Sequence, residues 1–387
     1  MSSSKSPKDP TMMDALIPII FLVILLSLSV YLYGDDSSYG ANQIALILSG
    51  GLASIIGLKN GHNWKAIEKG IIDGISLGMG AVLILLAVGA LIGTWVMSGT
   101  VPAMIYFGLN ILSPSIFYFA ACVICALSAL SIGSSWTVAG TLGAALMGIS
   151  IGLGLSPAIT AGAVISGSYF GDKMSPLSDT TNLAPAVTGT DLFTHIRHMI
   201  WTTGPSLIIS LVIFLILGFQ SSSAGNDSGL EIIQSSIRGS FNISPLSFIP
   251  LLAVFIMAYK KVPAFPTVMI GSLLGGVFAV IFQPHIISSF VSRPELSYSL
   301  TMISGVWTAL FSGFEFNSGN SMVDDLLSRG GMISMLNPIW LVICSMSFGS
   351  VLETTGLLHR LVSSMLSFVN STASLIVTTV ATCIGVN

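Results

Sequence analysis

The chain is dominated by apolar runs long enough to cross a lipid bilayer. A transmembrane helix needs about 20 mostly apolar residues, and the run from Ala15 to Tyr33 reaches this length without a charged residue. Only 7% of the 387 residues are charged, against about 25% in soluble domains, and the mean hydropathy is +0.90. The sequence therefore predicts an all-α polytopic membrane protein, with spans near 13–33, 42–58, 72–97, 204–219, 245–259, 264–283 and 335–355, and with further apolar pieces at 115–133, 142–154 and 156–169.

Composition and motifs argue against several other classes of protein. A net charge of −3 gives no sign of nucleic-acid binding. No P-loop is present, and no Ser/His/Asp or zinc-type spacing stands out, so we expect neither an enzyme nor a bound cofactor. The CxxC of Cys122 and Cys125 lies in an apolar run without a histidine or a second pair, which favours a buried apolar role.

The distribution of basic residues predicts the orientation of the spans. Lys5 and Lys8 place the N-terminus in the cytoplasm. The segment 115–154 is either a re-entrant hairpin or two crossings, and charge does not separate these because both leave the same orientation downstream. Length favours the hairpin, since the apolar piece 142–154 has only 13 residues and is too short to span.

Shorter pieces are expected to connect the spans. Three of them are amphipathic, at 101–112, 191–200 and 357–369. Residues 220–242 are expected to be a Ser/Gly/Asn loop because they show no apolar period, and residues 284–334 are mixed in character.

A weak internal repeat relates the two halves of the chain. Residues Leu91–Leu109 align with Phe348–Leu366 at an offset of 257, which places Gly99 on Gly356. If the hairpin does not cross, the first repeat has five crossings, and an odd number inverts the second repeat. Such inverted repeats are the plan of many secondary transporters.

The repeat also predicts a longer protein. The second repeat's own hairpin and broken helix would lie beyond Asn387, inside an apolar run. We therefore expect a further segment of about 70 residues or more, by analogy with the first repeat.

The segment Ser166–Pro185 places charges, hydroxyls and prolines between apolar flanks. An unpaired charge in the hydrocarbon region is costly, so ionisable residues there are functional candidates. Pro176 and Pro185 break helical hydrogen bonding and free backbone carbonyls. Asp172 and Asp179 could each bind a cation or a proton. Oxygen ligands suit a small hard cation, and the nearby side chains that offer them are Ser175, Ser178, Thr180, Thr181 and Asn182.

Two alternatives stay open for this segment. Lys173 either neutralises an aspartate when no cation is bound or extends to the membrane surface. The whole segment could instead be a cytoplasmic loop with solvated charges, although it holds few basic residues and unusually many hydroxyls and prolines.

A second polar group lies between two apolar pieces, at Ser134, Ser135 and Thr137. Two half-helices that meet at a polar tip would direct helix ends and free backbone groups at an ion. The alternative is one helix kinked by serines that bond back to its own carbonyls.

Two of these motifs carry a family resemblance. "GSSWTVAGTLG" (133–143) and "SGSYFGDKMSPLSDTTNLAPAVTGTDLFTHIRHM" (166–199) resemble the NhaC family of Na⁺/H⁺ antiporters, as does the region around Leu91–Leu109. The resemblance implies a homodimer in which a transport domain moves past a fixed scaffold, an elevator motion. It also implies sodium sites at the hairpin tip and at the helix break, that is, at Ser134, Ser135 and Thr137 and within Asp172–Asn182.

The same resemblance implies a division of the chain. Residues 1–100 are expected to form scaffold helices of the first repeat, and 245–356 those of the second. The transport part of the first repeat is expected at 101–220, with the hairpin 115–154, a broken helix 156–190 and a last span 204–219, and that of the second repeat begins at 357–387.

The expected function is exchange of Na⁺ for H⁺ across a prokaryotic inner membrane. The protein's partners are then the two transported ions, membrane lipid and a second copy of the chain, with no cofactor and no nucleic acid. The alternative is a Na⁺/H⁺-coupled organic-acid exchanger of the malate/lactate type, which the motifs do not separate from a simple antiporter. An ion channel is a third candidate, which bilayer conductance would distinguish from saturable exchange.

Overall fold

The computed structural model describes residues 7–176, 178, 181, 185, 190–221, 227–293 and 295–366. In this part of the chain the regular structure is helical, apart from an isolated antiparallel bridge between Phe314 and Arg329. Eight helices there are long and apolar enough to cross a membrane, and the bent pair Ile233–Ser240 and Pro245–Tyr259 would make a ninth span. The prediction of an all-α, multi-pass membrane protein is therefore confirmed.

The chain divides into two compact units, each with its own core. The first unit comprises Met1–Val82 and Leu336–Asn387, and the second comprises Leu83–Met335. The long helix α3 (Trp64–Met97) carries the chain from the first unit into the second.

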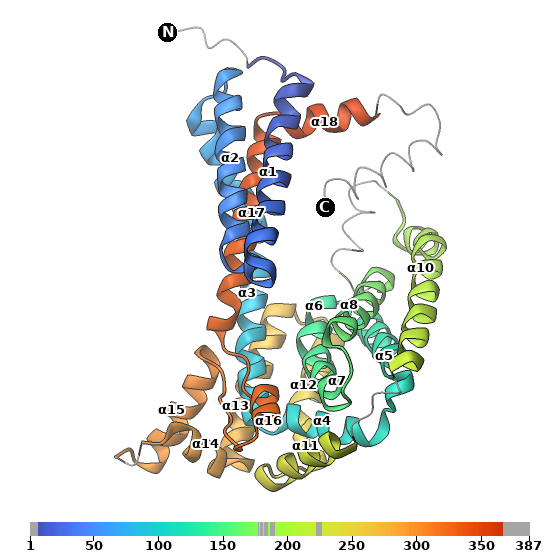
Figure 1. Cartoon of the computed structure of the whole chain (residues 1–387), viewed down its shortest axis with the longest axis vertical. Helices are drawn as coiled ribbons and strands as arrows, with labels where there is room; N and C mark the ends of the chain where they lie inside the picture. Colours follow the sequence, from blue (N-terminus) through green and yellow to red (C-terminus); the bar gives the residue numbers. More distant parts are fainter. Residues whose placement is uncertain are drawn as a thin grey trace. The chain divides into compact units, whose positions relative to one another are not determined.

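The first unit is a bundle of apolar helices joined through small residues. Figure 1 shows α1 (Met12–Tyr33), α2 (Ala41–Lys59) and α17 (Leu336–Thr354) side by side, with α18 (Leu357–Leu366) running across them. Close approach is possible because glycines of α2 and α3 face small hydroxyl side chains, as where Gly74 meets Ser350. At the N-terminus, Thr11 caps α1 through Asp14, and Lys59 reaches the same carboxylate at 3.2 Å.

The second unit holds the remaining helices and the central polar motifs of the sequence. Its first part contains α4 (Thr100–Ile111), η2 (Pro114–Ile116), α5 (Phe117–Ile132), α6 (Ser135–Val138), a π-helical turn at Ala139–Gly143, α7 (Ala144–Gly152), α8 (Pro157–Met174) and α10 (Leu192–Ser221). Its second part contains α11 (Asp227–Ser240), η5 (Pro245–Phe248), α12 (Ile249–Tyr259), α13 (Ala264–Phe282), α14 (Pro284–Val291), α15 (Tyr298–Phe311), α16 (Ser321–Leu327) and η6 (Met332–Met335).

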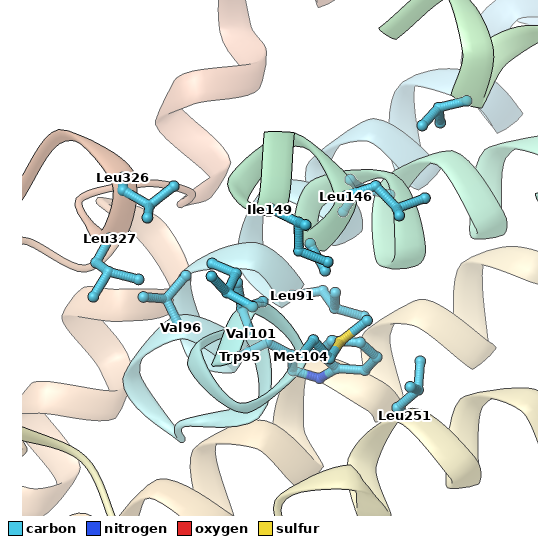
Figure 2. Packing of buried hydrophobic residues seen from close by; sticks show 14 of the residues in the cluster. Leu91, Trp95, Val96, Val101, Met104, Leu146, Ile149, Leu251, Leu326 and Leu327 are labelled. Atoms are coloured by element: carbon cyan, nitrogen blue, oxygen red, sulfur yellow. The ribbon is translucent and has the colours of Figure 1, made fainter. Parts of the chain in front are cut away.

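The core of the second unit brings together segments that are distant in the sequence. Figure 2 shows Leu91 and Trp95 of α3 beside Met104 of α4, with Ile149 of α7 and Leu327 of α16 in the same buried cluster. Trp95 is fully buried, and its indole nitrogen donates to the Gly271 carbonyl of α13 at 3.0 Å. A buried donor with a partner avoids the cost of an unmade hydrogen bond, so this contact holds α3 and α13 in register.

Most predicted spans agree with the helices. The bounds of α1, α2, α13 and α17 lie within a few residues of the expected spans, and α3 begins at Trp64 rather than near residue 72. The pieces 191–200 and 204–219 are one continuous helix, α10, in which Pro205 lies within the helix without ending it.

The prediction of a structureless loop at 220–242 is wrong, because Asp227–Ser240 form the helix α11. Ile233 and Ile237 stand four residues apart, so they share one face, and both side chains are fully buried. The sequence pattern did not predict this helix because many serines and glycines surround the two isoleucines.

The length argument for a re-entrant hairpin is also wrong. It counted only the 13 residues of the apolar piece 142–154, but helical structure begins at Ser135 and continues to Gly152. These 18 residues are long enough and apolar enough to cross a membrane. Length therefore does not distinguish a hairpin from two crossings.

Candidate functional site: the seam between α5 and α8

The helices α5 and α8 pack at very short range. A Cβ atom added to Gly167 would collide with the Cys122 carbonyl, and one added to Gly171 would collide with the Ala126 carbonyl. Glycine at both positions of α8 therefore allows the two backbones to touch. The consequence is a close-packed seam between α5 and α8, and the residue of α8 that follows Gly171 is Asp172.

Asp172 is buried at the end of this seam. Its side chain lies in the last turn of α8, and the residue is 7% exposed. The Ser135 hydroxyl donates to the Asp172 carboxylate oxygen Oδ2 at 3.0 Å. Ser135 is itself buried, so a carboxylate and a hydroxyl separated by 37 residues in the sequence meet away from bulk water.

The first polar motif forms the turn that delivers Ser135. Gly133 ends α5 in the left-handed conformation, with φ of 75°. The Ser134 hydroxyl then accepts from the backbone N–H of Thr137 at 3.3 Å and from the Thr137 hydroxyl at 3.0 Å. This is the N-cap pattern in which a side-chain oxygen satisfies a helix-start donor, and it turns the chain sharply between α5 and α6.

A π-helical turn follows directly, at Ala139–Gly143. Short π-helical segments inside α-helices are frequently found at functional sites. Within it, the Thr141 hydroxyl donates to the Thr137 carbonyl at 2.6 Å. The hydroxyl groups that begin at Ser134 therefore continue into the π-helical turn.

The second polar motif turns away from the helix axis just after Asp172. Helix α8 ends at Met174, directly before Ser175 and Pro176, as expected from the proline. Thr181 returns toward the helix end, and its hydroxyl lies 3.1 Å from the carbonyls of both Asp172 and Lys173. The Thr181 N–H also donates to the Ser178 hydroxyl at 3.3 Å. The end of α8 is thereby surrounded by buried hydroxyl groups.

The structure brings together most of the residues expected at an ion site. Ser135 and Thr137 are buried beside the tip, and Ser175, Ser178 and Thr181 are buried beside the end of α8. Ser134 and Lys173 are partly buried. Asp172 belongs to the helix rather than to the irregular stretch, because α8 continues through Gly171 to Met174. Asp179, Thr180 and Asn182 lie outside the described residues.

Ser168 is a polar residue of this seam that the sequence motifs did not single out. Ser168 is 1% exposed, and its hydroxyl makes no hydrogen bond within ordinary distance and angle limits, although the Cys125 thiol of α5 lies beside it. It stands four residues before Asp172, so both side chains lie on one face of α8. The four-residue spacing between Ser168 and Asp172 was the sequence signal that could have identified Ser168 as part of the site.

The donor set favours one class of ion. Among the described residues no group of three or more His, Cys, Asp or Glu side chains could hold a metal ion. The oxygen atoms around Asp172 come from one carboxylate and from hydroxyls and carbonyls. Hard oxygen ligands with little formal charge suit a small monovalent cation, whereas Zn²⁺ prefers nitrogen and sulfur ligands.

Comparison with known proteins gives a consistent result. A family profile described as "Na+/H+ antiporter family" matches residues 167–387. The chain is 36% identical over 345 residues to the Na(+)/H(+) antiporter NhaC of Alkalihalophilus pseudofirmus, covering 89% of this chain and 71% of that protein. It is 34% identical over 362 residues to the malate-2H(+)/Na(+)-lactate antiporter of Bacillus subtilis, covering 93% and 73%.

A third relative is named as an antiporter of amino acids. The chain is 33% identical over 368 residues to the arginine/ornithine antiporter ArcD of Halobacterium salinarum, covering 94% of this chain and 72% of that protein. No solved structure was found to match. The match of the profile to more than half of the chain, and the extent of the similarity to the relatives, show that this chain belongs to the Na⁺/H⁺ antiporter family.

Proposed function

We propose that this protein is a secondary active antiporter that exchanges Na⁺ for H⁺ across a prokaryotic cytoplasmic membrane. The buried contact between the Ser135 hydroxyl and the Asp172 carboxylate carries this proposal. A carboxylate held out of water binds either a proton or a cation, because two positive charges on one buried group would repel each other. Competition for Asp172 then couples the two ions without any chemical step.

The surrounding hydroxyls explain how Na⁺ is accepted. A hydroxyl has one proton and two lone pairs, so the Ser135 hydroxyl donates to the empty carboxylate and turns an oxygen lone pair toward a bound cation. In the same way, the Thr181 hydroxyl donates to the backbone carbonyls of Asp172 and Lys173 when no cation is bound. On Na⁺ binding these groups exchange a hydrogen bond for an ion contact, which replaces the lost hydration shell.

The buried hydroxyl of Ser168 extends the same site by one helical turn. A buried polar group without a well-formed hydrogen bond costs free energy. A cation or a proton-carrying water that entered from Asp172 would relieve this cost. We therefore assign Ser168 to the ion site together with the sequence-predicted oxygen ligands and Asp179.

Local conformation supports the inverted-repeat interpretation. Gly99 and Gly356, paired by the offset of 257, have φ of 80° and 75°. Each precedes a short helix, α4 and α18 respectively. We propose that residues 101–220 and 357–387 belong to the transport parts, and that residues 1–100 and 245–356 form the scaffold of a homodimer. In this arrangement the N-terminus is cytoplasmic and the transport parts move as an elevator.

The test is loss of the Asp172 carboxylate. Asp172→Asn keeps the shape of the side chain but removes the titratable charge, so Na⁺-dependent proton movement in vesicles should be lost while the protein still inserts. Asp191→Asn is the matched control, because Asp191 is an exposed carboxylate that caps the start of α10 through Thr194. Full dye-detected antiport by the Asp172→Asn protein would contradict the proposal. Asp179→Asn is expected to abolish exchange as well.

A second candidate is Na⁺- and H⁺-coupled exchange of organic acids. The similarity to the malate-2H(+)/Na(+)-lactate antiporter, over 93% of this chain, favours it. Vesicles preloaded with unlabelled malate and exposed to labelled malate or lactate separate the two functions. Counterflow that requires Na⁺ would establish the organic-acid exchanger, whereas Na⁺/H⁺ exchange at full rate without any organic acid would establish the simple antiporter.

A further inference from the structure

The segment between α15 and α17 forms a folded loop in the second unit that the ion site does not use. Phe314 and Arg329 exchange both backbone hydrogen bonds, at 3.1 and 3.0 Å. The Ser328 hydroxyl donates to the Phe316 carbonyl at 3.2 Å and accepts from the Phe316 N–H at 2.9 Å. These four bonds make a clasp that joins Phe314 to Arg329 across 14 intervening residues.

The clasp is fastened to the long helix α3. The Gly331 N–H donates to the Gly89 carbonyl of α3 at 2.7 Å. Gly330 and Gly331 have φ of 90° and 82°, a conformation that favours glycine. A Cβ on Gly330 would collide with the backbone of Gly93. The loop is therefore held in one shape by its backbone.

This clasp forms a pocket of about 740 Å³, within the size range of small-molecule sites. Phe290, Phe314 and Phe316 line one part of it, with ring centroids 5.1 Å apart for Phe290 and Phe314 and 6.3 Å for Phe314 and Phe316. The remaining lining is polar and includes Glu315, Asp324 and Arg329. An apolar floor with a few charged groups is the usual plan of a site for a small organic molecule.

The charged groups in the pocket are not paired with each other. Arg329 is partly buried, its Nε donates to the Asp325 carbonyl at 3.4 Å, and its charge is attracted by the Asp325 carboxylate. No ion pair within 4.0 Å joins Arg329 to Glu315. Asp324 is already engaged by the N–H and the hydroxyl of Ser318, at 2.6 and 2.7 Å. Within the pocket lining, the Arg329 guanidinium and the exposed Glu315 carboxylate are therefore not paired with each other.

We propose that this pocket binds the zwitterion of an α-amino acid. The Arg329 guanidinium would receive the α-carboxylate, the Glu315 carboxylate would receive the α-ammonium, and the phenylalanine rings would receive the side chain. A simple anion fits less well because Glu315 and Asp324 both repel it, and a simple cation fits less well because Arg329 repels it. Only a ligand with both charges satisfies Arg329 and Glu315 together.

This site is separate from the proposed ion site. None of the pocket residues belongs to the set around Asp172. The amino-acid site therefore stands or falls independently of Na⁺/H⁺ exchange, and its test measures binding rather than transport.

The experiment is titration calorimetry of the purified full chain in detergent with L-leucine and two truncated analogues. 4-Methylpentanoate keeps the carboxylate but lacks the ammonium, and 3-methylbutylamine keeps the ammonium but lacks the carboxylate. We expect saturable binding of L-leucine and binding of each analogue weaker by at least about tenfold, since each loses one charged hydrogen-bonding partner. Equal binding of either analogue, or no saturable binding of L-leucine, would overturn the proposal.

Two variants assign the binding to this pocket. Arg329→Gln and Glu315→Gln should each weaken L-leucine binding by at least about tenfold. Arg293→Gln and Glu295→Gln are matched controls, because both residues are exposed and neither lines the pocket. Glu315 is exposed and makes no contact that the fold requires, so its variant remains informative if Arg329→Gln fails to fold. Unchanged binding by Glu315→Gln would overturn the assignment.

Discussion

The seam at Asp172 and the pocket at Arg329 are two polar regions of the same unit, built in opposite ways. The seam is closed and made by helices, since glycines bring α5 against α8 and leave space only for small oxygen groups. The pocket is open and made by a loop, whose backbone clasp holds charged side chains apart around a volume of about 740 Å³. The proposed ion site thus depends on helix contact, whereas the proposed amino-acid site depends on the conformation of a loop.

The largest effect is expected from a substitution that forces α5 and α8 apart. Gly167→Ala places a methyl group against the Cys122 carbonyl, and forcing such a contact costs about 3 kcal/mol. The melting temperature in detergent should fall and exchange should be lost. Gly162→Ala on the same helix is the control, because no atom lies within 4 Å of the added Cβ. Equal melting temperatures for the two variants would show that the seam is not close-packed.

The next effect concerns the hydroxyl that meets the carboxylate. Ser135→Ala removes the hydrogen bond to Asp172 at 3.0 Å, so the apparent affinity for Na⁺ should fall about tenfold, the value of one hydrogen bond to a charged group. Exchange rates measured against Na⁺ concentration give this affinity. Ser131→Ala, which removes an exposed hydroxyl from α5, should leave it unchanged. An unaltered Na⁺ dependence in Ser135→Ala would remove this residue from the site.

A smaller effect is expected at Ser168, where a change in Na⁺ affinity can be distinguished from a change in stability. Its buried hydroxyl makes no hydrogen bond within ordinary limits, so Ser168→Ala removes an unmet group and should not lower the melting temperature. The apparent affinity for Na⁺ should nevertheless fall about threefold, because one oxygen ligand is lost. Ser206→Ala on α10 is the control, since that hydroxyl is exposed and bonds its own helix. A variant that is less stable but has normal Na⁺ affinity would make Ser168 a structural residue.

The smallest effect is expected in the open pocket. Hydrogen bonds from the N–H and the hydroxyl of Ser318 lower the pKa of Asp324 below its ordinary value. A lowered pKa in the folded state stabilises the protein above the unfolded-state pKa, and this stabilisation is lost as pH falls through the folded-state pKa. Asp324→Asn should therefore be slightly less stable than wild type at pH 7, and the difference should shrink below about pH 4. A difference that is constant between pH 7 and pH 3 would contradict this origin.

Much of the fold and part of the site followed from local pattern. Apolar runs such as Ala15–Tyr33 predicted spans because only a helix satisfies backbone polar groups in lipid. Pro176 marked the end of α8 correctly. These signals lie within short segments, where spacing and residue type already limit the backbone. That the two polar motifs share one site was implied only by the family resemblance, and Ser135 does contact Asp172.

Other features could not be found in that way. Helix α11 was missed because its stability comes from Ile233 and Ile237 packing on other helices, against a polar local composition. The extent of α8 through Asp172 depends on the contact of Gly171 with α5. The pocket at Arg329 needs a bridge between residues 15 positions apart and an anchor on α3, neither of which leaves a periodic signal.

The sequence by itself determined that this chain is a helical membrane protein with oxygen-rich interruptions, because long apolar runs and helix-breaking residues act through local hydrogen bonding and hydration. Only the tertiary structure decided which of those oxygens lie together. The Ser135–Asp172 contact joins residues 37 positions apart, and such a distance is closed by the packing of whole helices, which is set by the sum of many side-chain contacts.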